Sequence, residues 1–254
     1  MNRIAALVAG VLLGLVASAG AARGQETTAQ ASEYVSTGSA EDPARDAAPV
    51  RNGDDDLAHR HAEEWTRREP GNADAWLALG IVLHDLERYN DAADAYGRAL
   101  RIDPKRSHVW VNLGIAYDKL TQPEQAIAAY RSALRLDLGV AVAWYNLGNT
   151  LRGINQHQKA VSAYRQALRI EPEHANAWNN LGLAYASLKQ YPDAIAAYQQ
   201  ALRIEPKFSR AWAGLALAQD AAGQHAEMIA SYRKLRSLDA VLSDMIFDTL
   251  IDPQ

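Results

Sequence analysis

The sequence of 254 residues contains no cysteine. This absence excludes disulfide bonds, thiolate metal sites, a cysteine nucleophile and lipid attachment through cysteine. The sequence also has neither a glycine-rich phosphate loop nor a nucleophile elbow. Seven histidines are present, but none lies four residues from another or in a metal-ligand motif. We therefore predict a protein that is not an enzyme, with no catalytic residues, no metal site and no cofactor.

An excess of charge of one sign is also missing. Lysine and arginine total 26 against 30 aspartate and glutamate residues, which gives a formal net charge of −4. Binding to a phosphate backbone requires a concentrated basic stripe, and the charges here alternate in sign along the chain. We therefore predict that nucleic acid is not a partner.

What the sequence does contain is a repeat. Five tryptophans recur at one constant interval, and a leucine follows each of them after three residues. These tryptophans are Trp76, Trp110, Trp144, Trp178 and Trp212. A fixed period of this length predicts a stacked repeat architecture. In such an array the apolar surface is buried between neighbouring copies rather than in one central core.

Residues 175–208 show what one copy contains. Two groups of apolar and small residues recur at helical spacing, so each group lines one face of a helix. The first group is Trp178, Leu181, Gly182 and Tyr185, and the second is Ala194, Tyr198, Ala201 and Leu202. Each copy is therefore predicted to be a hairpin of two helices, which we call helix A and helix B. Pro192 suits the first turn of helix B, and Pro206 ends that helix.

This pattern resembles the tetratricopeptide repeat, in which tryptophan, leucine, glycine and tyrosine mark helix A, and alanine, an aromatic residue, alanine and proline mark helix B. The resemblance implies an all-α fold, a right-handed helical-hairpin solenoid of tetratricopeptide repeats. The expected repeats cover residues 73–106, 107–140, 141–174, 175–208 and a divergent fifth at 209–242. Where Leu138 replaces the usual proline, we expect Gly139 to end the helix in a left-handed cap.

The segments outside the five repeats differ from them in composition. Residues 1–22 combine a basic start, an uncharged apolar run and small residues, a pattern typical of a secretory signal. Residues 23–53 have no apolar periodicity and are predicted to form a disordered linker. Cleavage would leave a periplasmic or secreted protein with no membrane contact. The alternative is an uncleaved run that anchors the protein in the membrane.

Two further helices are predicted at the ends of the array. Residues 54–72 align with a helix B whose helix A is missing, so they form an N-terminal capping half-repeat. Residues 243–254 form a C-terminal capping helix, and the apolar pattern that leads into it begins at Val241. Val241, Leu242, Met245, Ile246 and Leu250 can share one face of this helix. That face serves either local packing or contact with a second copy or another partner.

Candidate binding residues lie on helix A, on the side opposite the face expected to meet helix B. In the family that side lines a concave groove. The sixth residue of the repeat is asparagine in the three middle copies, and an asparagine side chain can pair with both the N–H and the C=O of a peptide backbone. The predicted peptide-binding residues are Asn112, Tyr145, Asn146, Asn149, Arg152, Asn176, Asn179 and Asn180. We expect the three sixth-position asparagines to face solvent when the groove is empty.

These observations favour a non-enzymatic scaffold in a bacterial envelope that holds an extended peptide segment of a partner protein during complex assembly. The alternative is a structural protein that forms homo-oligomers through its C-terminal helix. The asparagine row itself has two interpretations, because asparagine is common at this position of the family and need not contact a ligand.

Overall fold

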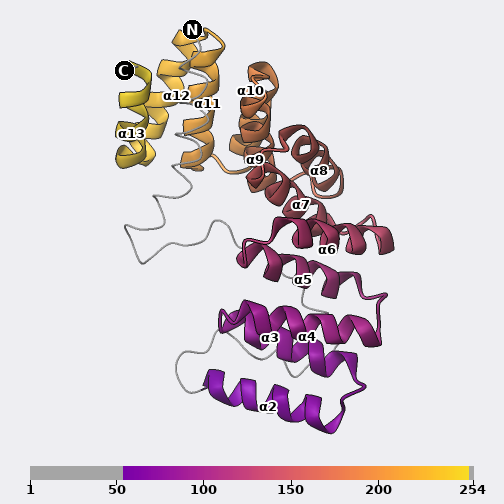
Figure 1. Ribbon diagram of the computed structural model, residues 1–254. Coiled ribbons are helices and arrows are strands. Elements are labelled where there is room, and N and C mark those ends of the chain that lie inside the picture. The colour runs from indigo at the N-terminus through magenta and orange to yellow at the C-terminus, as the bar shows by residue number, and fades with distance from the viewer. Residues whose placement is uncertain (1–53, 252–254) are drawn as a thin grey trace. The chain divides into compact units, whose positions relative to one another are not determined.

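The computed structural model describes residues 54–251, and every regular element in this range is a helix (Figure 1). The predicted signal peptide and linker lie outside the described residues. The helices are α2 (Asp54–Arg68), α3 (Ala73–Asp85), α4 (Tyr89–Ile102), α5 (Ser107–Lys119), α6 (Pro123–Leu136), α7 (Ala141–Gly153), α8 (His157–Ile170), α9 (Ala175–Ser187), α10 (Tyr191–Ile204), α11 (Ser209–Ala221), α12 (His225–Leu238) and α13 (Ala240–Ile251). The predicted all-α fold is confirmed.

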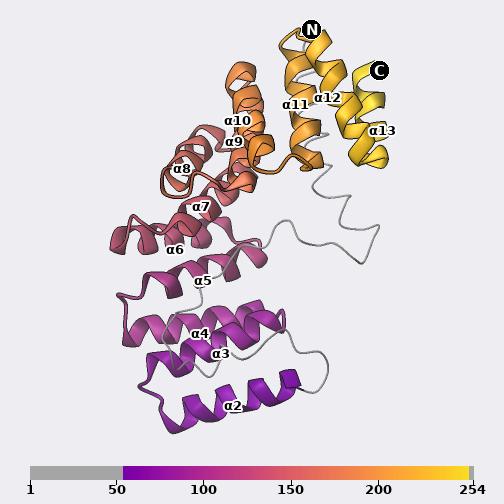
Figure 2. The ribbon, with the colours of Figure 1, turned by 180° about the vertical axis from the view of Figure 1, so that it is seen from behind.

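The described residues form two compact units, an N-terminal unit with α2–α7 and a C-terminal unit with α8–α13. In the N-terminal unit, α3 pairs with α4 and α5 with α6, and each helix also packs against the next one along the chain. The C-terminal unit repeats this scheme, with hairpins α9–α10 and α11–α12 (Figure 2). Among the described residues, no helix is both long enough and apolar enough to cross a membrane.

Glycine allows the two helices of a hairpin to approach closely. Tyr130 of α6 is fully buried, and its ring lies over Gly114 of α5. A Cβ atom at Gly114 would lie only 2.5 Å from the Tyr130 ring. The same contact joins Gly80 to Tyr96 in the first hairpin. The helix A glycine is therefore required by the aromatic residue of helix B, because any side chain there would displace the ring.

Each tryptophan holds the turn that precedes its own repeat. Its indole N–H donates a hydrogen bond to the backbone carbonyl six residues earlier, at distances of 2.7 to 3.0 Å. The accepting carbonyls belong to Pro70, Pro104, Leu138, Pro172 and Pro206. Because the acceptor is a main-chain oxygen, Leu138 fulfils this role as well as a proline does.

Helix A ends in a left-handed residue in every repeat. The residues with positive φ are Glu87, Thr121, Asn155, Lys189 and Gly223, which occupy equivalent positions in the five repeats. In the first hairpin the N–H of Arg88 donates to the carbonyl of Leu83 at 2.8 Å, the bond that closes a Schellman motif. Glycine, the residue that adopts this conformation most easily, is found only in the fifth repeat.

The expectation of a left-handed cap at Gly139 is wrong. Helix α6 ends at Leu136, and Asp137 is already extended, with φ −150° and ψ 111°. The carboxylate of Asp137 then accepts a hydrogen bond from the N–H of Gly139 at 2.7 Å. Among the described glycines, only Gly223 has a positive φ. The aspartate side chain therefore forms the turn, and no left-handed residue is needed.

The shared apolar face expected for the C-terminal helix is also corrected. Helix α13 begins at Ala240, and Leu242 and Ile246 pack against α11 and α12. Val241 and Met245 lie outside this contact, with 64% and 44% of their surface exposed. The packed side of α13 therefore includes the buried Ser243 together with Ile246, and it does not include Val241 or Met245.

Candidate functional site

The sixth-position asparagines of the N-terminal unit do not face solvent. Asn112 on α5 is 0% exposed and Asn146 on α7 is 1% exposed. This corrects the expectation that these side chains line an open surface. The physical reason is that α5 contacts three helices, α4, α6 and α7, so the side opposite helix B is covered by the next helix A. Tyr145, which precedes Asn146, is buried as well.

The accessible polar residues of this unit lie nearer the C-terminal end of α7. Asn149 and Arg152, both predicted to bind peptide, are partly exposed. Asn149 follows Asn146 after three residues and Arg152 follows Asn149 after three more, so each lies next to the previous one on the helix surface. The N-terminal unit therefore has two layers of candidate residues, a buried amide layer and a partly exposed layer that a ligand can reach.

In the C-terminal unit the three predicted residues belong to α9. Asn179 is buried, whereas Asn176 and Asn180 are partly exposed. The side-chain NH2 of Asn179 donates to the side-chain oxygen of Asn180 at 3.1 Å. The buried amide therefore orients the accessible one.

Several buried polar atoms on the A helices have no hydrogen-bond partner among the described residues. These atoms are Nε2 of His108, Nδ2 of Asn146, Nε of Arg152 and Oδ1 of Asn179. Burial lowers the pKa of His108, and nearby Arg106 lowers it further, which favours a neutral ring. An unsatisfied buried polar group costs about 1–3 kcal/mol. This cost disappears if a bound molecule supplies the missing partner.

A polar cluster that the sequence analysis did not identify lies beside these residues. Asp118 of α5 accepts hydrogen bonds from the hydroxyl of Tyr130 at 2.7 Å and from the hydroxyl of Thr150 at 2.9 Å. Burial raises the pKa of Asp118, although both hydrogen bonds oppose this shift. Burial and the Asp118 carboxylate together raise the pKa of Tyr130 well above its ordinary value. The cluster joins α5, α6 and α7 and is satisfied internally, so it serves structure rather than binding.

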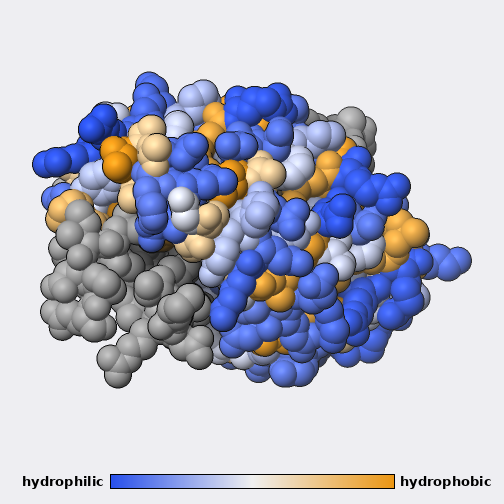
Figure 3. All heavy atoms as spheres, turned by 90° about the horizontal axis from the view of Figure 1, so that it is seen from above, coloured by the Kyte–Doolittle hydropathy of each residue, from blue (hydrophilic) through white to orange (hydrophobic). Residues whose placement is uncertain are grey.

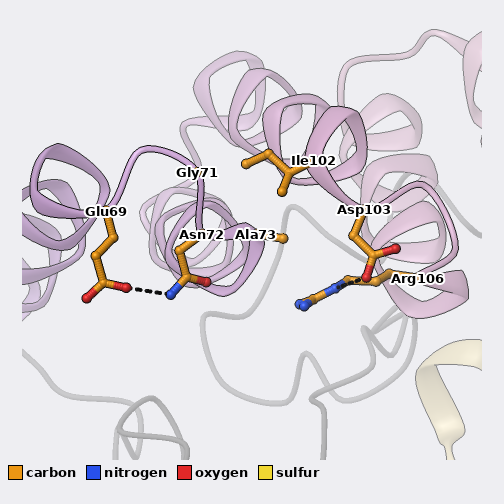
Figure 4. Close-up of a pocket in the computed structure, with 7 residues that line it drawn as sticks. All are labelled: Glu69, Gly71, Asn72, Ala73, Ile102, Asp103 and Arg106. Atoms are coloured by element: carbon orange, nitrogen blue, oxygen red, sulfur yellow. Dashed lines mark hydrogen bonds and ion pairs between the residues drawn. The ribbon is translucent and has the colours of Figure 1, made fainter.

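Two clefts were found away from the predicted residues. One, of about 720 Å³, lies in the N-terminal unit (Figure 4). Its polar groups pair with each other: Asn72 donates to Glu69 at 2.7 Å, and Arg106 donates to Asp103 at 3.0 Å and also binds Asp74. These groups are already satisfied and offer little to a ligand.

The second cleft, of about 880 Å³, lies in the C-terminal unit between α8, α9 and α10. Trp178, Leu181 and Tyr185 form part of its wall, and the charged residues around it, Arg165, Arg169 and Asp193, are of both signs. On the face shown in Figure 3, hydrophobic residues occur in small separate groups within a mostly hydrophilic surface. Within residues 54–251, no group of three histidine or acidic residues could hold a metal ion.

Comparisons with known proteins agree with the repeat pattern. A family model described as tetratricopeptide repeat matches residues 49–107, 111–170, 145–207 and 189–240. A crystal structure of the MamA protein is 27% identical over 66% of this chain and 92% of that protein, with a TM-score of 0.63. A comparison with curated protein sequences gives no match.

Two more distant structures share the fold. YrrB, described as a tetratricopeptide repeat protein with an unusual peptide-binding site, is 15% identical over 75% of this chain and all of its own length, with a TM-score of 0.67. MamA from Desulfovibrio magneticus RS-1 is 19% identical over 75% of this chain and 98% of its own, with a TM-score of 0.58.

Proposed function

The chain belongs to the tetratricopeptide repeat family, and from this premise we propose that it is a non-enzymatic scaffold that binds an extended peptide segment of a partner protein. The observation that carries the proposal is the set of unsatisfied buried polar atoms on α5, α7 and α9. All of these atoms lie on A helices, the side of the repeat on which asparagines recur. The description of YrrB as a peptide-binding member of the fold supports the same ligand class.

The accessible residues make the first contacts in this proposal. Asn149 and Arg152 do so in the N-terminal unit, and Asn176 and Asn180 in the C-terminal unit. Asparagine side chains pair with backbone N–H and C=O groups, so they bind an extended segment with little dependence on its sequence. The guanidinium of Arg152 adds a donor for a carbonyl or carboxylate oxygen. In this proposal the buried residues of the A helices hold the accessible ones in place. These buried residues are Asn112, Tyr145, Asn146 and Asn179.

The cellular setting is part of the proposal. The signal-like leader favours export, so the scaffold would act in the periplasm or outside the cell, in assembling a complex of the bacterial envelope. N-terminal sequencing of the protein from an envelope fraction should place the mature start between Gly20 and Gln25. An intact Met1 would instead support the membrane-anchored alternative.

Photo-crosslinking tests the site directly. A photoreactive amino acid at Asn149 should capture a partner in envelope fractions, and mass spectrometry then identifies the crosslinked segment. The same group at the exposed Gln158 of α8 is the control, because this position lies on a helix B. A synthetic peptide of the mapped segment should bind the intact chain, and Asn149→Ala with Arg152→Ala should weaken this binding by roughly 10- to 100-fold. Equal crosslinking from both positions would contradict the proposal.

A further inference from the structure

The second cleft, between α8, α9 and α10, has an aromatic floor and small side chains along one wall. The floor consists of the buried Leu181 and the partly exposed rings of Trp178 and Tyr185, all on α9. Ala196 and Ala197 line the wall on α10, and their methyl groups leave the space beside the rings open. Helix α9 packs against both α8 and α10, and all three helices belong to the C-terminal unit. The cleft is therefore built within one compact unit.

Trp178 offers a ligand its ring rather than a hydrogen bond. Its indole N–H already donates to a main-chain carbonyl at 2.7 Å. In the first repeat the ring of Trp76 is covered, because the guanidinium carbon of Arg98 lies 4.7 Å from its centroid. The equivalent residue of the fourth repeat is Gln200, whose side-chain oxygen instead accepts a hydrogen bond from Arg203 at 3.1 Å. Among the described residues no cation covers Trp178, so its ring can pack against an aromatic side chain of a ligand.

The two arginines at the rim of the cleft have no acidic partner within residues 54–251. No carboxylate there forms an ion pair with Arg165 or Arg169. Arg169 donates only to the neutral side chain of Gln166, at 3.3 Å. One repeat later, the equivalent Arg203 pairs with Glu173 at 2.9 Å. Both rim arginines are exposed, and a ligand carboxylate would supply the partner that they lack.

The acidic residue of the cleft lies away from these arginines. Asp193 on α10 occupies the same repeat position as Lys159 on α8. That position is six residues before Arg165, or about 9 Å along the helix axis. Positive charge is therefore concentrated at one end of the cleft, and a single negative charge stands at the other. A ligand that places carboxylates beside the arginines meets charge of the opposite sign.

We propose that this cleft is a second protein-interaction site, which binds a short segment of a partner that carries an aromatic residue flanked by carboxylates. The aromatic ring packs on Trp178 and Leu181, and the flanking carboxylates meet Arg165 and Arg169 at the rim. Along α8 the lining residues extend from Ser162 to Arg169, which is about 10 Å and matches about three residues of an extended segment. The site lies on the helix B side, so this inference does not depend on peptide binding by the A helices.

The first test uses the blocked peptide Gly-Asp-Phe-Asp-Gly as a probe for the full chain labelled with nitrogen-15 in its tryptophans. The indole N–H signal of Trp178, identified by its loss in Trp178→Phe, should move with peptide concentration and reach saturation. Replacing both aspartates of the peptide by asparagine should weaken binding roughly 3- to 20-fold, because two exposed ion pairs are lost. Replacing them by lysine should abolish binding, and so should replacing the phenylalanine by alanine. An unmoved Trp178 signal, or equal binding of the lysine peptide, would overturn the proposal.

Filling the cleft provides the sharper test. Ala196→Glu occupies the space beside the rings with a charge of the same sign as the peptide, so binding should weaken at least about tenfold. The matched control is Ala230→Glu, which changes an exposed alanine at the same repeat position on α12. At that junction Gln219 takes the position of Tyr185, and the change should leave the affinity unaltered. Equal losses in the two variants would contradict the site.

The arginines are tested separately from the apolar floor. Arg165→Ala with Arg169→Ala should weaken binding of the aspartate peptide by roughly the same 3- to 20-fold factor and leave binding of the asparagine peptide unchanged. Equal weakening of both peptides would show that charge does not select the ligand. Circular dichroism establishes that each variant keeps its helices. If Ala196→Glu loses helicity, the arginine variant decides the outcome, because it is altered only at exposed residues.

Two other occupants of the cleft give distinct results in the same measurement. A Trp178 signal that moves with protein concentration alone, before any peptide is added, would assign the cleft to a second copy of the chain. Tighter binding of AMP than of the aspartate peptide would assign it to a nucleotide, whose base stacks on the ring while its phosphate meets the arginines. Either result would overturn the proposal.

Discussion

The second and fifth hairpins follow the same sequence pattern but are packed to different depths. Helix α6 of the second buries five residues, whereas α12 of the fifth buries two. Tyr130 is fully buried against Gly114, while the corresponding Tyr232 is partly exposed and faces a helix that carries Ala216 in place of glycine. One methyl group at the helix crossing therefore limits how closely the aromatic ring can approach.

The polar contacts of the two hairpins differ in the same direction. In the second hairpin, the carboxylate of Asp118 joins Tyr130 and also reaches Thr150 of the following helix. In the fifth, the buried pair is neutral and lies one position earlier in the repeat, with the hydroxyl of Ser231 donating to Gln219 at 2.7 Å. The tighter hairpin therefore buries its carboxylate between helices, whereas the equivalent Asp220 of the looser one lies 3.2 Å from Nδ1 of the exposed His225. The two hairpins should therefore respond differently to pH.

Removing the aromatic ring should give the largest difference between the hairpins. Tyr130→Ala should lower the free energy of unfolding by about 3–5 kcal/mol, because it leaves a cavity among fully buried neighbours. Tyr232→Ala should cost less than half as much, since its ring is already partly exposed. Urea denaturation followed by circular dichroism measures both. Equal losses would show that burial of the ring does not separate the two hairpins.

Adding the methyl group to the tight hairpin should have the next largest effect. Gly114→Ala should destabilise by about 1–3 kcal/mol, because the new Cβ overlaps the buried Tyr130 ring. Gly97→Ala in α4 is the matched control, since no atom lies within 4 Å of its Cβ position. That change should stabilise by about 0.5–1 kcal/mol through helix propensity. Destabilisation by both changes would mean that steric overlap with Tyr130 is not the cause.

The buried carboxylate should make stability depend on pH. Because the pKa of Asp118 is raised in the folded state, the fold binds this proton more tightly than the unfolded chain does. Its contribution is fully present below the unfolded pKa, about 3.9, and is lost as pH rises through the folded pKa. Asp118→Asn should flatten this part of the stability profile in pH-dependent urea titrations. Ser231→Ala removes no ionisable group, so it should leave the shape of the stability profile against pH unchanged.

The smallest expected effect concerns the turn after helix A. Thr121 is β-branched and has φ 56°, a strained conformation that Gly223 adopts in the fifth hairpin at φ 77°. Thr121→Gly should therefore stabilise by about 0.5–1 kcal/mol, and Gly223→Thr should destabilise by a similar amount. Thermal unfolding measures both changes. A loss of stability in Thr121→Gly would show that other contacts of the threonine outweigh the strain.

The sequence was sufficient to predict the hairpins because the same helix–helix contacts recur in each repeat and leave a periodic apolar pattern. It was not sufficient for the side chains between neighbouring A helices. A projection of a single helix distinguishes only the face toward helix B from the face away from it. Asn112 lies on the face away from helix B, which we therefore expected to be exposed. Contact between α5 and α7 covers that face, and this neighbour cannot be inferred from a single helix.

Two further features of the structure could not be predicted from the sequence. Thr150 meets Asp118 from the following repeat, and no other repeat has this pair of residue types at these positions. The left-handed residues Glu87, Thr121 and Lys189 belong to types that seldom adopt this conformation. Only Asn155 and Gly223 are of types that favour this turn, and two of five copies do not establish a rule for the array.

The tryptophan bond to the preceding turn affects how such an array can change length. Donor and acceptor are only six residues apart in the chain, so a duplicated or deleted block of one repeat length carries a complete junction with it. The series ends at Ile246, which occupies the position that a sixth tryptophan would take after Trp212. An isoleucine side chain has no N–H to donate, and the connection there shortens to the single residue Asp239 between α12 and α13. An insertion of repeats before Trp212 would thus reproduce the junction, whereas a copy built on α13 would not.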